Sequence, residues 1–277
     1  MPQFWNSNFE RVNKLMNQSN ANKLVDPLLL NSFEEFQSLR RHGQDAKDYM
    51  VRRKAFAEEV GNSDLWHFVD HFGLYAGTQT IATYMAVHDL VRATIGVPGH
   101  VMEFGSHHGA KLLFMAKLLE LYTSTSIKKV FGFDSFEGLR TFGALDGEKS
   151  LSMEGCYIGN EDVLRKSIKL FGYEEWVHLV KGDARVTIPA FAEAFPYTMV
   201  SLAYIDFDLY EPCQVALKFL GPRMATGGII AFDEALTDFF PGEGIAMLEF
   251  LEDHAHARFE MKSSPIALQP TVWLVKK

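Results

Sequence analysis

The 277-residue chain has little of what marks secreted, membrane or nucleic-acid-binding proteins. Its two cysteines, Cys156 and Cys213, are too few for a disulfide framework, and we expect both to be reduced thiols. No apolar run approaches the length needed to span a bilayer, and the first residues lack the charged-then-apolar pattern of a secretion signal. The net charge is −8 without any basic tract, which argues against a nucleic-acid partner. Together these absences favour a cytoplasmic protein that works without a membrane.

What is present is enough apolar sequence for a sizeable core, since 47% of the residues are hydrophobic. We expect two parts. Residues 1–98 read as a helical N-terminal extension, used as a lid or for homo-oligomerisation, with segments such as 8–17, 45–60 and a capping box from Ser32 to Glu35. Residues 99–277 alternate between short apolar runs and segments of helical spacing, which predicts an α/β domain.

Five apolar strands of this domain each end at an acid. The expected strands are 101–104, 128–133, 176–180, 199–205 and 229–232, with a final pair at 258–261 and 271–275. The acids are Glu103, Asp134, Asp183, Asp206 and Asp233. Because parallel strands in one sheet end at the same edge, we expect these five acids to line one rim. Acids buried without partners are costly, so five in succession favour a shared cationic or hydroxyl-bearing ligand.

The segment His-Val-Met-Glu-Phe-Gly-Ser-His-His-Gly, residues 100–109, predicts a strand and a glycine turn, followed by a helix at 110–122. A dinucleotide site would favour Gly-x-Gly-x-x-Gly, but here the pattern is Glu-x-Gly-x-x-x-Gly. The Glu103 carboxylate would repel phosphate and attract a cation. S-adenosylmethionine carries an ammonium and a sulfonium and no phosphate. The other interpretation is an ordinary strand-to-helix turn.

Several segments resemble class I S-adenosylmethionine-dependent methyltransferases, and more narrowly the macrocin O-methyltransferase family, which methylates sugar hydroxyls on macrolide natural products. They are the glycine turn at 103–109, Asp-Ser-Phe-Glu-Gly-Leu at 134–139, Gly-Asp at 182–183, Asp-Phe-Asp-Leu-Tyr-Glu at 206–211 and Phe-Asp-Glu at 232–234. The resemblance covers residues 78–277. It implies a Rossmann-like, mostly parallel seven-stranded sheet with helices on both faces.

The resemblance also implies cofactor-binding residues. Glu103 would pair with the ammonium of S-adenosylmethionine, and Asp134 would accept both ribose hydroxyls unless it caps a helix. Asp183 would take the adenine amino group, with a helix cap as the alternative, and Ser135 and Phe136 would border the adenosine. The remaining expected cofactor contacts are Gly105, Ser106, Gly109 and Asp206.

A magnesium site is implied by the same family. Asp206, Asp233 and Glu234 would supply the oxygen ligands that a hard cation prefers. Family members have an Asp-Asp pair where this chain has Asp233-Glu234, and Asp208 is an alternative to Asp206. In the opposing interpretation, the acid pair merely caps the next segment.

The general base is a departure from the family, which uses a histidine in the loop after the second strand. This chain has no histidine between Phe136 and Trp176. His107, His108 and Tyr157 are the catalytic candidates by location.

The expected function is Mg²⁺-dependent O-methylation of a hydroxyl on a sugar or similar polyhydroxylated small molecule, as part of natural-product biosynthesis. One alternative is a metal-independent N-methyltransferase acting on an amino sugar. The other is a non-methylating relative of the fold that binds a nucleoside ligand. The identity of the acceptor and the methylated position are open at this stage.

Overall fold

The structure, a computed structural model, describes residues 65–123, 127–254 and 258–277. The chain forms two compact units, Met1–Asp70 and His71–Lys277. In the first unit the described part is helix α4, Leu65–Asp70. The segments expected at 8–17 and 45–60, and the capping box of Ser32, lie outside the described residues.

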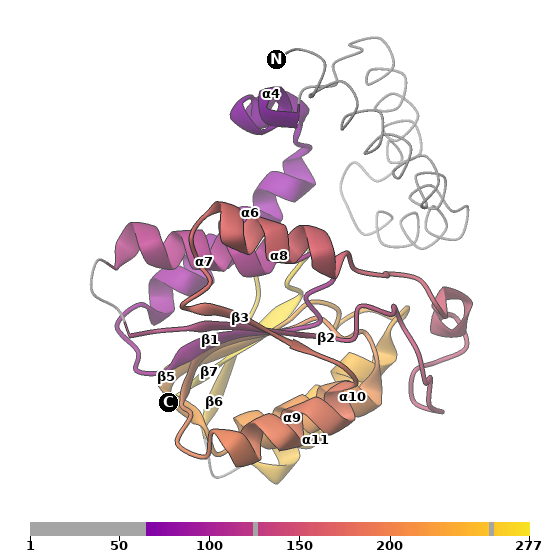
Figure 1. Ribbon diagram of the computed structural model, residues 1–277. Helices are drawn as coiled ribbons and strands as arrows, with labels where there is room; N and C mark the ends of the chain where they lie inside the picture. The colour runs from indigo at the N-terminus through magenta and orange to yellow at the C-terminus, as the bar shows by residue number, and fades with distance from the viewer. Residues whose placement is uncertain (1–64, 124–126, 255–257) are drawn as a thin grey trace. The chain divides into compact units, whose positions relative to one another are not determined.

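The second unit is built on a seven-stranded sheet, as expected (Figure 1). Its strands are β1 (His100–Phe104), β2 (Val130–Asp134), β3 (Val177–Lys181), β4 (Val200–Ile205), β5 (Met224–Phe232), β6 (Phe259–Lys262) and β7 (Val272–Lys276). Their order is β3-β2-β1-β4-β5-β7-β6. Strands β1 to β5 pair in parallel, whereas β7 is antiparallel to both β5 and β6. The mostly parallel sheet predicted from the sequence is confirmed.

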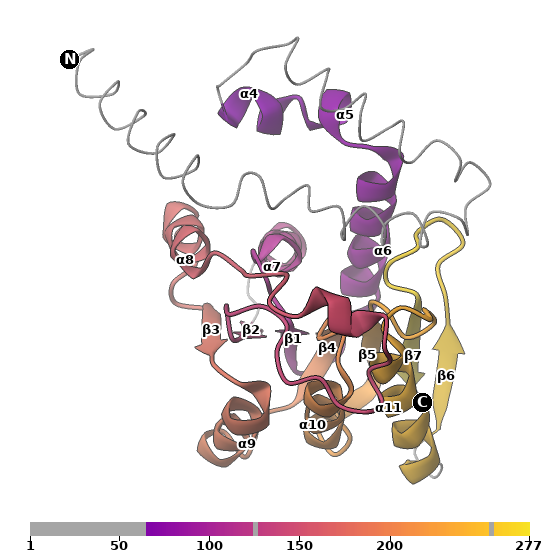
Figure 2. The ribbon, with the colours of Figure 1, turned by 90° about the vertical axis from the view of Figure 1, so that its right-hand side faces the viewer.

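Helices cover both faces of the sheet (Figures 1 and 2). One face carries α6 (Thr78–Thr94), α7 (Ala110–Tyr122) and α8 (Glu161–Leu170). The other carries α9 (Ala184–Ala194), α10 (Tyr210–Leu220) and α11 (Pro241–Asp253). The short α5 (Phe72–Tyr75) precedes α6, and a 3₁₀ turn, η2 (Ser150–Met153), lies in the long connection after β2.

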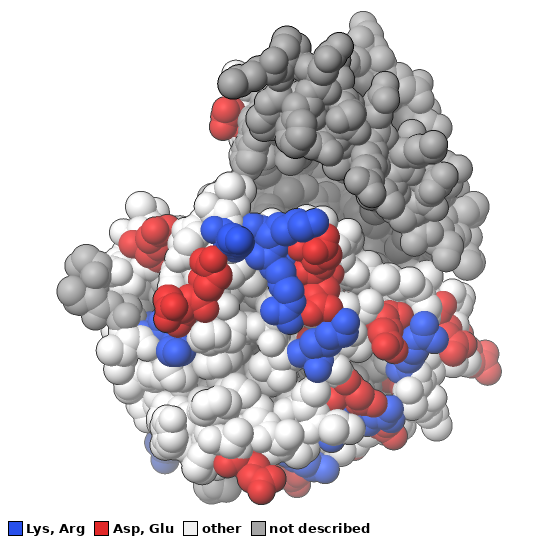
Figure 3. Space-filling model, viewed as in Figure 1, with Lys and Arg blue, Asp and Glu red and all other residues white. Residues whose placement is uncertain are grey.

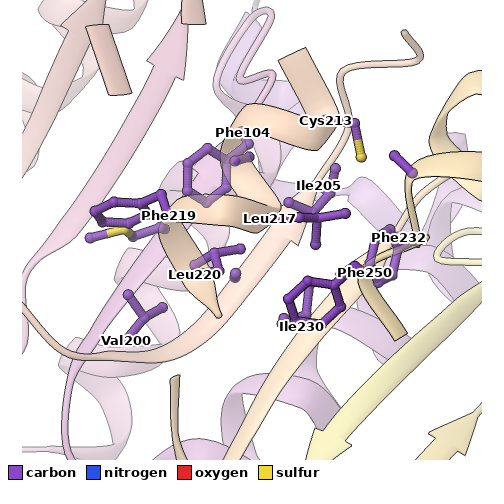
Figure 4. Close-up of a cluster of buried hydrophobic side chains, with 14 of the residues drawn as sticks. Phe104, Val200, Ile205, Cys213, Leu217, Phe219, Leu220, Ile230, Phe232 and Phe250 are labelled. Carbon is purple, nitrogen blue, oxygen red and sulfur yellow. The ribbon is translucent and has the colours of Figure 1, made fainter. Parts of the chain in front are cut away.

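Two hydrophobic clusters hold these layers together. The cluster under α9, α10 and α11 joins Phe104 and Ile205 of the sheet to Leu217 and Phe250 of the helices, all at most 4% exposed (Figure 4). The second cluster, on the opposite face, packs the apolar sides of α6, α7 and α8 on the sheet. Both clusters are built from hydrophobic and aromatic side chains that pack the helices on the two faces of the sheet.

Helix α6 belongs to the compact unit of the sheet. Val87, Leu90 and Val91 are at most 2% exposed and pack in the second cluster. The division between the units therefore falls after Asp70, nearer the N-terminus than the boundary at residue 98 expected from the sequence. Gly77 is the residue that precedes α6.

Strand β5 is longer than the 229–232 segment expected, since it begins at Met224. It pairs with β4 at Val200↔Met224 and again at Leu202↔Ile229, and the register shifts between the two pairs. The extra residues form an irregular stretch that includes Gly227, whose φ of +82° suits a glycine. Gly227 and Gly228 therefore lie inside the strand.

None of the helices in the described part of the chain is both long and apolar enough to cross a membrane. On the face drawn in Figure 3, acidic and basic side chains are interspersed in small groups.

Candidate active site

A cavity of about 610 Å³ opens at the carboxyl edge of the parallel strands. Side chains and backbone from the ends of β1, β2, β3, β4 and β5 all line it, as the rule for open α/β sheets predicts. Of the residues expected at the site, those lining the cavity are Gly105, His107, Asp134, Ser135, Tyr157, Asp183, Asp206, Asp233 and Glu234.

Several residues with strained backbone conformations lie around this cavity. Among the described residues, the non-glycine positions with positive φ are His107, Phe136, Thr141, Tyr157 and Asp208, with φ between 48° and 64°. All but Phe136 line the cavity. Each such conformation costs about 1–2 kcal/mol for an L-residue, so its concentration at one place indicates that the site geometry is retained for function.

Gly105 directly follows the last paired residue of β1 beside the end of β4, and its φ is +96°. A Cβ atom built on it would come within 1.8 Å of the Asp206 carbonyl oxygen. The glycine at position 105 is therefore required by the close approach of the β1 and β4 ends, in addition to any approach of a ligand to its backbone. Gly105 is buried and lines the cavity where the ends of β1 and β4 lie side by side.

Glu103, in β1 just before the turn, is completely buried. Neither of its carboxylate oxygens has a hydrogen bond of good geometry among the described residues, although the buried Ser106 hydroxyl lies close enough to lower the Glu103 pKa. Burial raises the pKa of Glu103 to about 8, partly opposed by the positive charge of Lys111. An unpaired carboxylate beneath the glycine turn provides a place for a cationic ligand group.

Asp134 ends β2 and its carboxylate is held in a fixed orientation. Oδ2 accepts the backbone N–H of His107 and Oδ1 accepts that of Phe136, both at 2.6 Å. Each oxygen keeps a lone pair on the cavity side, which suits a vicinal diol. No helix begins here, so the alternative role as a helix cap is wrong.

Three other expected cofactor residues have structural roles in this fold. Gly109 begins α7 with φ of +74°, and a Cβ there would come within 2.2 Å of the Leu164 side chain. Phe136 is 8% exposed and packs in the second cluster. Asp183 caps α9 by accepting the N–H of Arg185, and its carboxylate also binds the Arg185 guanidinium. Gly109 and Phe136 do not line the cavity, whereas Asp183 does.

The acids after β4 and β5 meet around a lysine that the sequence did not single out. Lys111, in the first turn of α7, places its Nζ 2.7 Å from Asp206 Oδ2 and 3.2 Å from Asp233 Oδ1. Burial alone lowers its pKa, but the two carboxylates outweigh this effect and raise the pKa well above its usual value. The buried hydroxyl of Tyr204 also donates to Asp233 Oδ1.

More acids surround this group. Glu234 accepts the amide N–H of Gln269 at 2.6 Å, and Glu243 accepts the backbone N–H of Glu234 at 2.9 Å. One oxygen of each of these two glutamates lacks a partner among the described residues. Burial is the main cause that raises the pKa of Glu234 to about 8 and the pKa of Asp208 well above its usual value.

The three acids expected to bind magnesium thus share the cavity, but they do not form a metal site as they stand. An ammonium group fills the space between Asp206 and Asp233, and the carboxylate of Glu234 is engaged by Gln269. Within the described ranges no three acid, histidine or cysteine side chains are arranged to hold an ion. We therefore derive no step through a metal.

The three catalytic candidates separate into two groups. His107 and Tyr157 both line the cavity, with ring centroids 6.0 Å apart. Burial and the adjacent His108 lower the pKa of His107 to about 4, so its imidazole is neutral at pH 7. His108 is not among the lining residues, and its Nδ1 accepts the backbone N–H of Asn160 at 3.2 Å, which fixes the loop before α8.

The long connection from β2 to α8 forms one wall of the cavity through Leu139, Arg140 and Thr141. Asp146, 1% exposed, holds it in place. Its two carboxylate oxygens accept the backbone N–H groups of Gly143 and of Tyr210 at the start of α10, both at 2.6 Å. Asp146 thus anchors this connection to α10.

Sequence reasoning did not single out Lys111, Tyr204, Glu243, Gln269 and Asp146. Lys111 interrupts an apolar run at the first turn of a helix, where a cation opposes the helix dipole, and that was the available signal. Gln269 reaches Glu234 only because β7 turns back beside β5, a contact that no local pattern carries.

Comparison with known proteins agrees with this fold. Two solved structures are similar along most of their length. CalS11, a calicheamicin methyltransferase, is 27% identical, with a TM-score of 0.71, and the match covers 83% of this chain and 93% of CalS11. NovP, an O-methyltransferase, is 19% identical, with a TM-score of 0.58, and the match covers 73% of this chain and 84% of NovP. A second CalS11 structure is described as a TDP-rhamnose 3'-O-methyltransferase, with 28% identity, TM-score 0.63, and coverage of 83% and 95%.

Sequence relatives match over a shorter span. The 8-demethyl-8-(2,3-dimethoxy-alpha-L-rhamnosyl)-tetracenomycin-C 4'-O-methyltransferase of Streptomyces olivaceus is 30% identical over 149 residues, 52% of this chain and 55% of that protein. The demethyldecarbamoylnovobiocin O-methyltransferase of Streptomyces niveus is 25% identical over 144 residues, 50% of this chain and 53% of that protein. The matches thus span about half the length of these relatives.

The profile of the macrocin O-methyltransferase (TylF) family matches residues 28–255, which is most of the chain. The matched range includes the ends of β1 to β5, from which the cavity is built. This chain therefore belongs to the macrocin O-methyltransferase family.

Proposed function

We propose that this protein transfers a methyl group from S-adenosylmethionine to a hydroxyl of a sugar or a sugar-bearing small molecule. The observation that carries the proposal is the pairing of two acids at neighbouring strand ends. Glu103 offers an unpaired buried carboxylate and Asp134 a fixed carboxylate that lines the cavity. A cationic group and a ribose diol on one ligand match these two acids.

Different residues would bind different parts of S-adenosylmethionine. Glu103 would become ionised against the ammonium group, and Gly105 lets the ligand approach the backbone. Asp134 would hold the ribose hydroxyls, and Ser135 and Asp183 lie on the same wall of the cavity. When bound, the cofactor supplies a methyl group activated by a positively charged sulfur.

At the acceptor end, Tyr157, Asp206 and Asp233 face the same cavity. The acceptor oxygen would form its bond to the methyl carbon while the carbon–sulfur bond breaks, with the electron pair left on sulfur and the hydroxyl proton passing to a carboxylate or imidazole of the wall. His107 is neutral and can accept a hydrogen bond there. Most of the rate gain would come from holding oxygen, carbon and sulfur in line.

A sugar acceptor is supported by the relatives, two of which are named for rhamnose or a rhamnosyl group. The cavity agrees with such an acceptor because carboxylates and a tyrosine line it beside the cofactor wall. N-methylation of an amino sugar is the second candidate. It is favoured by the same acids, which would attract a protonated amine and take its proton before the nitrogen attacks the methyl carbon, and it requires no metal.

The resemblance also predicts a magnesium requirement. The position of Lys111 between two of the expected ligands argues against that requirement. Activity in the presence of excess EDTA is the direct measurement once an acceptor is in hand.

Thermal unfolding with S-adenosylhomocysteine, the cofactor product, tests the proposal without an acceptor. A ligand at a hundredfold excess over its Kd stabilises the native state by about 2.7 kcal/mol. We expect a clear rise in Tm for the natural chain and none for Asp134→Ala. Asp162→Ala is the control, because that side chain is 72% exposed and pairs with Lys166 on the surface of α8. The absence of a shift in the natural chain would remove the methyltransferase proposal.

A further inference from the structure

Lys111 is the least expected feature of the cavity. It is the second residue of α7, where backbone N–H groups are unpaired and the helix dipole is positive, so a lysine there is disfavoured by the helix itself. Its side chain is only 20% exposed, and it points to the strand ends instead of the solvent. Strong local attraction must hold it in this place.

That attraction comes from two strands at once. Asp206 follows β4 and Asp233 follows β5, and the ammonium group contacts one carboxylate oxygen of each. The ammonium also lies 4.7 Å from the centre of the Tyr204 ring. Since the Asp233 side chain is 4% exposed, water does little to screen its charge. The lysine bridges the two acids as a cation with fixed position.

The same position is the one that a divalent ion would need. A metal held by Asp206 and Asp233 must lie within about 2.1–2.6 Å of an oxygen of each, and Nζ fills that space. Asp233 Oδ1 is further occupied, because it accepts hydrogen bonds from both Lys111 and Tyr204. To bind there, an ion would have to displace a charged lysine and take over both contacts.

We propose that Lys111 is the resident cation of this acid cluster and replaces a divalent metal between Asp206 and Asp233. The cluster keeps its geometry through a covalently attached charge, and the acceptor side of the cavity is assembled in the absence of metal. In the proposed methyl transfer, on which this last step rests, the ammonium supplies the positive charge facing the acceptor oxygen. Metal-free activity of the natural chain is the consequence.

Mn²⁺ binding to the full chain tests the claim, because free and bound Mn²⁺ differ in their paramagnetic resonance signal. We expect the natural chain to bind Mn²⁺ no tighter than millimolar. Lys111→Met keeps the length of the side chain and removes its charge, and it should bind Mn²⁺ at least tenfold more tightly. Lys117→Met is the matched control, since Lys117 lies on the same helix but over the ring of Phe171. It should behave as the natural chain does.

Micromolar Mn²⁺ binding by the natural chain would overturn the proposal, even if Lys111→Met did not fold. Equal, weak binding by the natural chain and by folded Lys111→Met would also overturn it, because the acids would then not form a cation site at all. S-adenosylhomocysteine binding is measured in parallel on each variant. If the natural chain does not bind S-adenosylhomocysteine, the methyltransferase function is contradicted, whereas the role of Lys111 as the resident cation is not.

Discussion

The buried carboxyl group of Glu103 has no hydrogen bond of good geometry in the described part of the chain, and burial raises its pKa to about 8. At pH 7 it is therefore mostly protonated in the free protein. A cationic ligand group stabilises the ionised form and lowers the pKa. We expect binding of S-adenosylhomocysteine at pH 7 to release close to one proton.

Calorimetry in two buffers of different ionisation enthalpy measures this proton directly. Glu103→Gln should bind more weakly and without proton release, since the amide cannot ionise. Asp162→Ala, on the exposed side of α8, should release the same proton as the natural chain. Proton release that persists in Glu103→Gln would show that another group titrates.

Among single residues, the sequence predicted those that follow a strand and carry charge. Asp134, Asp206 and Asp233 line the cavity as expected, because parallel strands bring their ends to one edge. It could not predict Lys111, since only the tertiary contact of α7 with the ends of β4 and β5 gives that side chain its partners. The same limit applies to Glu243, which is recognisable as a site residue only once α11 has packed beneath Glu234.

At the scale of elements, the junction of β1 and β4 depends on Gly105. Its φ is +96°, and an added Cβ would lie 1.8 Å from the Asp206 carbonyl oxygen. We expect Gly105→Ala to lower the free energy of unfolding by about 3 kcal/mol or more, because both backbone strain and a backbone clash must be relieved. Urea denaturation measures this difference.

Gly155→Ala separates the two causes. That glycine also has positive φ, +74°, but a Cβ there would meet nothing within 4 Å. Its substitution should cost only the strain of a left-handed alanine, about 1 kcal/mol. Similar losses in the two variants would show that the clash at Gly105 is relieved without cost.

The loop between β2 and α8 is a second element whose position depends on one side chain. Asp146→Ala removes two hydrogen bonds to a carboxylate, from Gly143 and Tyr210. Such bonds contribute about 1.5 kcal/mol or more each, so the loop should open more often. We expect trypsin to cleave after Arg140 or Lys149 at least tenfold faster. Asp162→Ala should leave the cleavage rate unchanged, and equal rates in all three proteins would contradict the anchor.

Element prediction succeeded where periodicity was strong. The helix expected at 110–122 matches α7 in both bounds. The start of β5 was missed because its first residues include Gly227 and Gly228, which read as a turn and instead form an irregular stretch within a paired strand. Sequence pattern alone does not distinguish these two uses of glycine.

For the whole molecule, stability should depend on pH in a window set by the buried acids. The pKa values of Glu103 and Glu234 are raised to about 8, chiefly by burial. In the native state these groups bind protons that the unfolded chain has lost above about pH 4.5, so stability falls as pH rises. We expect the Tm of the free protein to decrease from pH 6.5 to pH 8.

Outside this window other groups oppose the trend. Below pH 6.5, burial keeps the His107 imidazole neutral, which favours the unfolded state. Burial also lowers the pKa of Lys128 to about 8. Above pH 8 the unfolded chain therefore keeps a proton that the native state loses, and stability rises with pH. Differential scanning calorimetry at pH 6.5 and 8 should show a smaller decrease for Glu103→Gln. An unchanged decrease would assign the slope to other groups.

The two apolar clusters that stabilise the sheet lie on its faces, whereas the chemistry is confined to one edge. This separation has a consequence for adaptation. Residues 137–149 can be replaced by the corresponding segment of a relative while Phe136 stays packed in the second cluster, provided that Asp146 is retained as the anchor to α10. Exchanging that stretch is thus a route to new acceptors at little cost in folding, and natural divergence has the same route open to it.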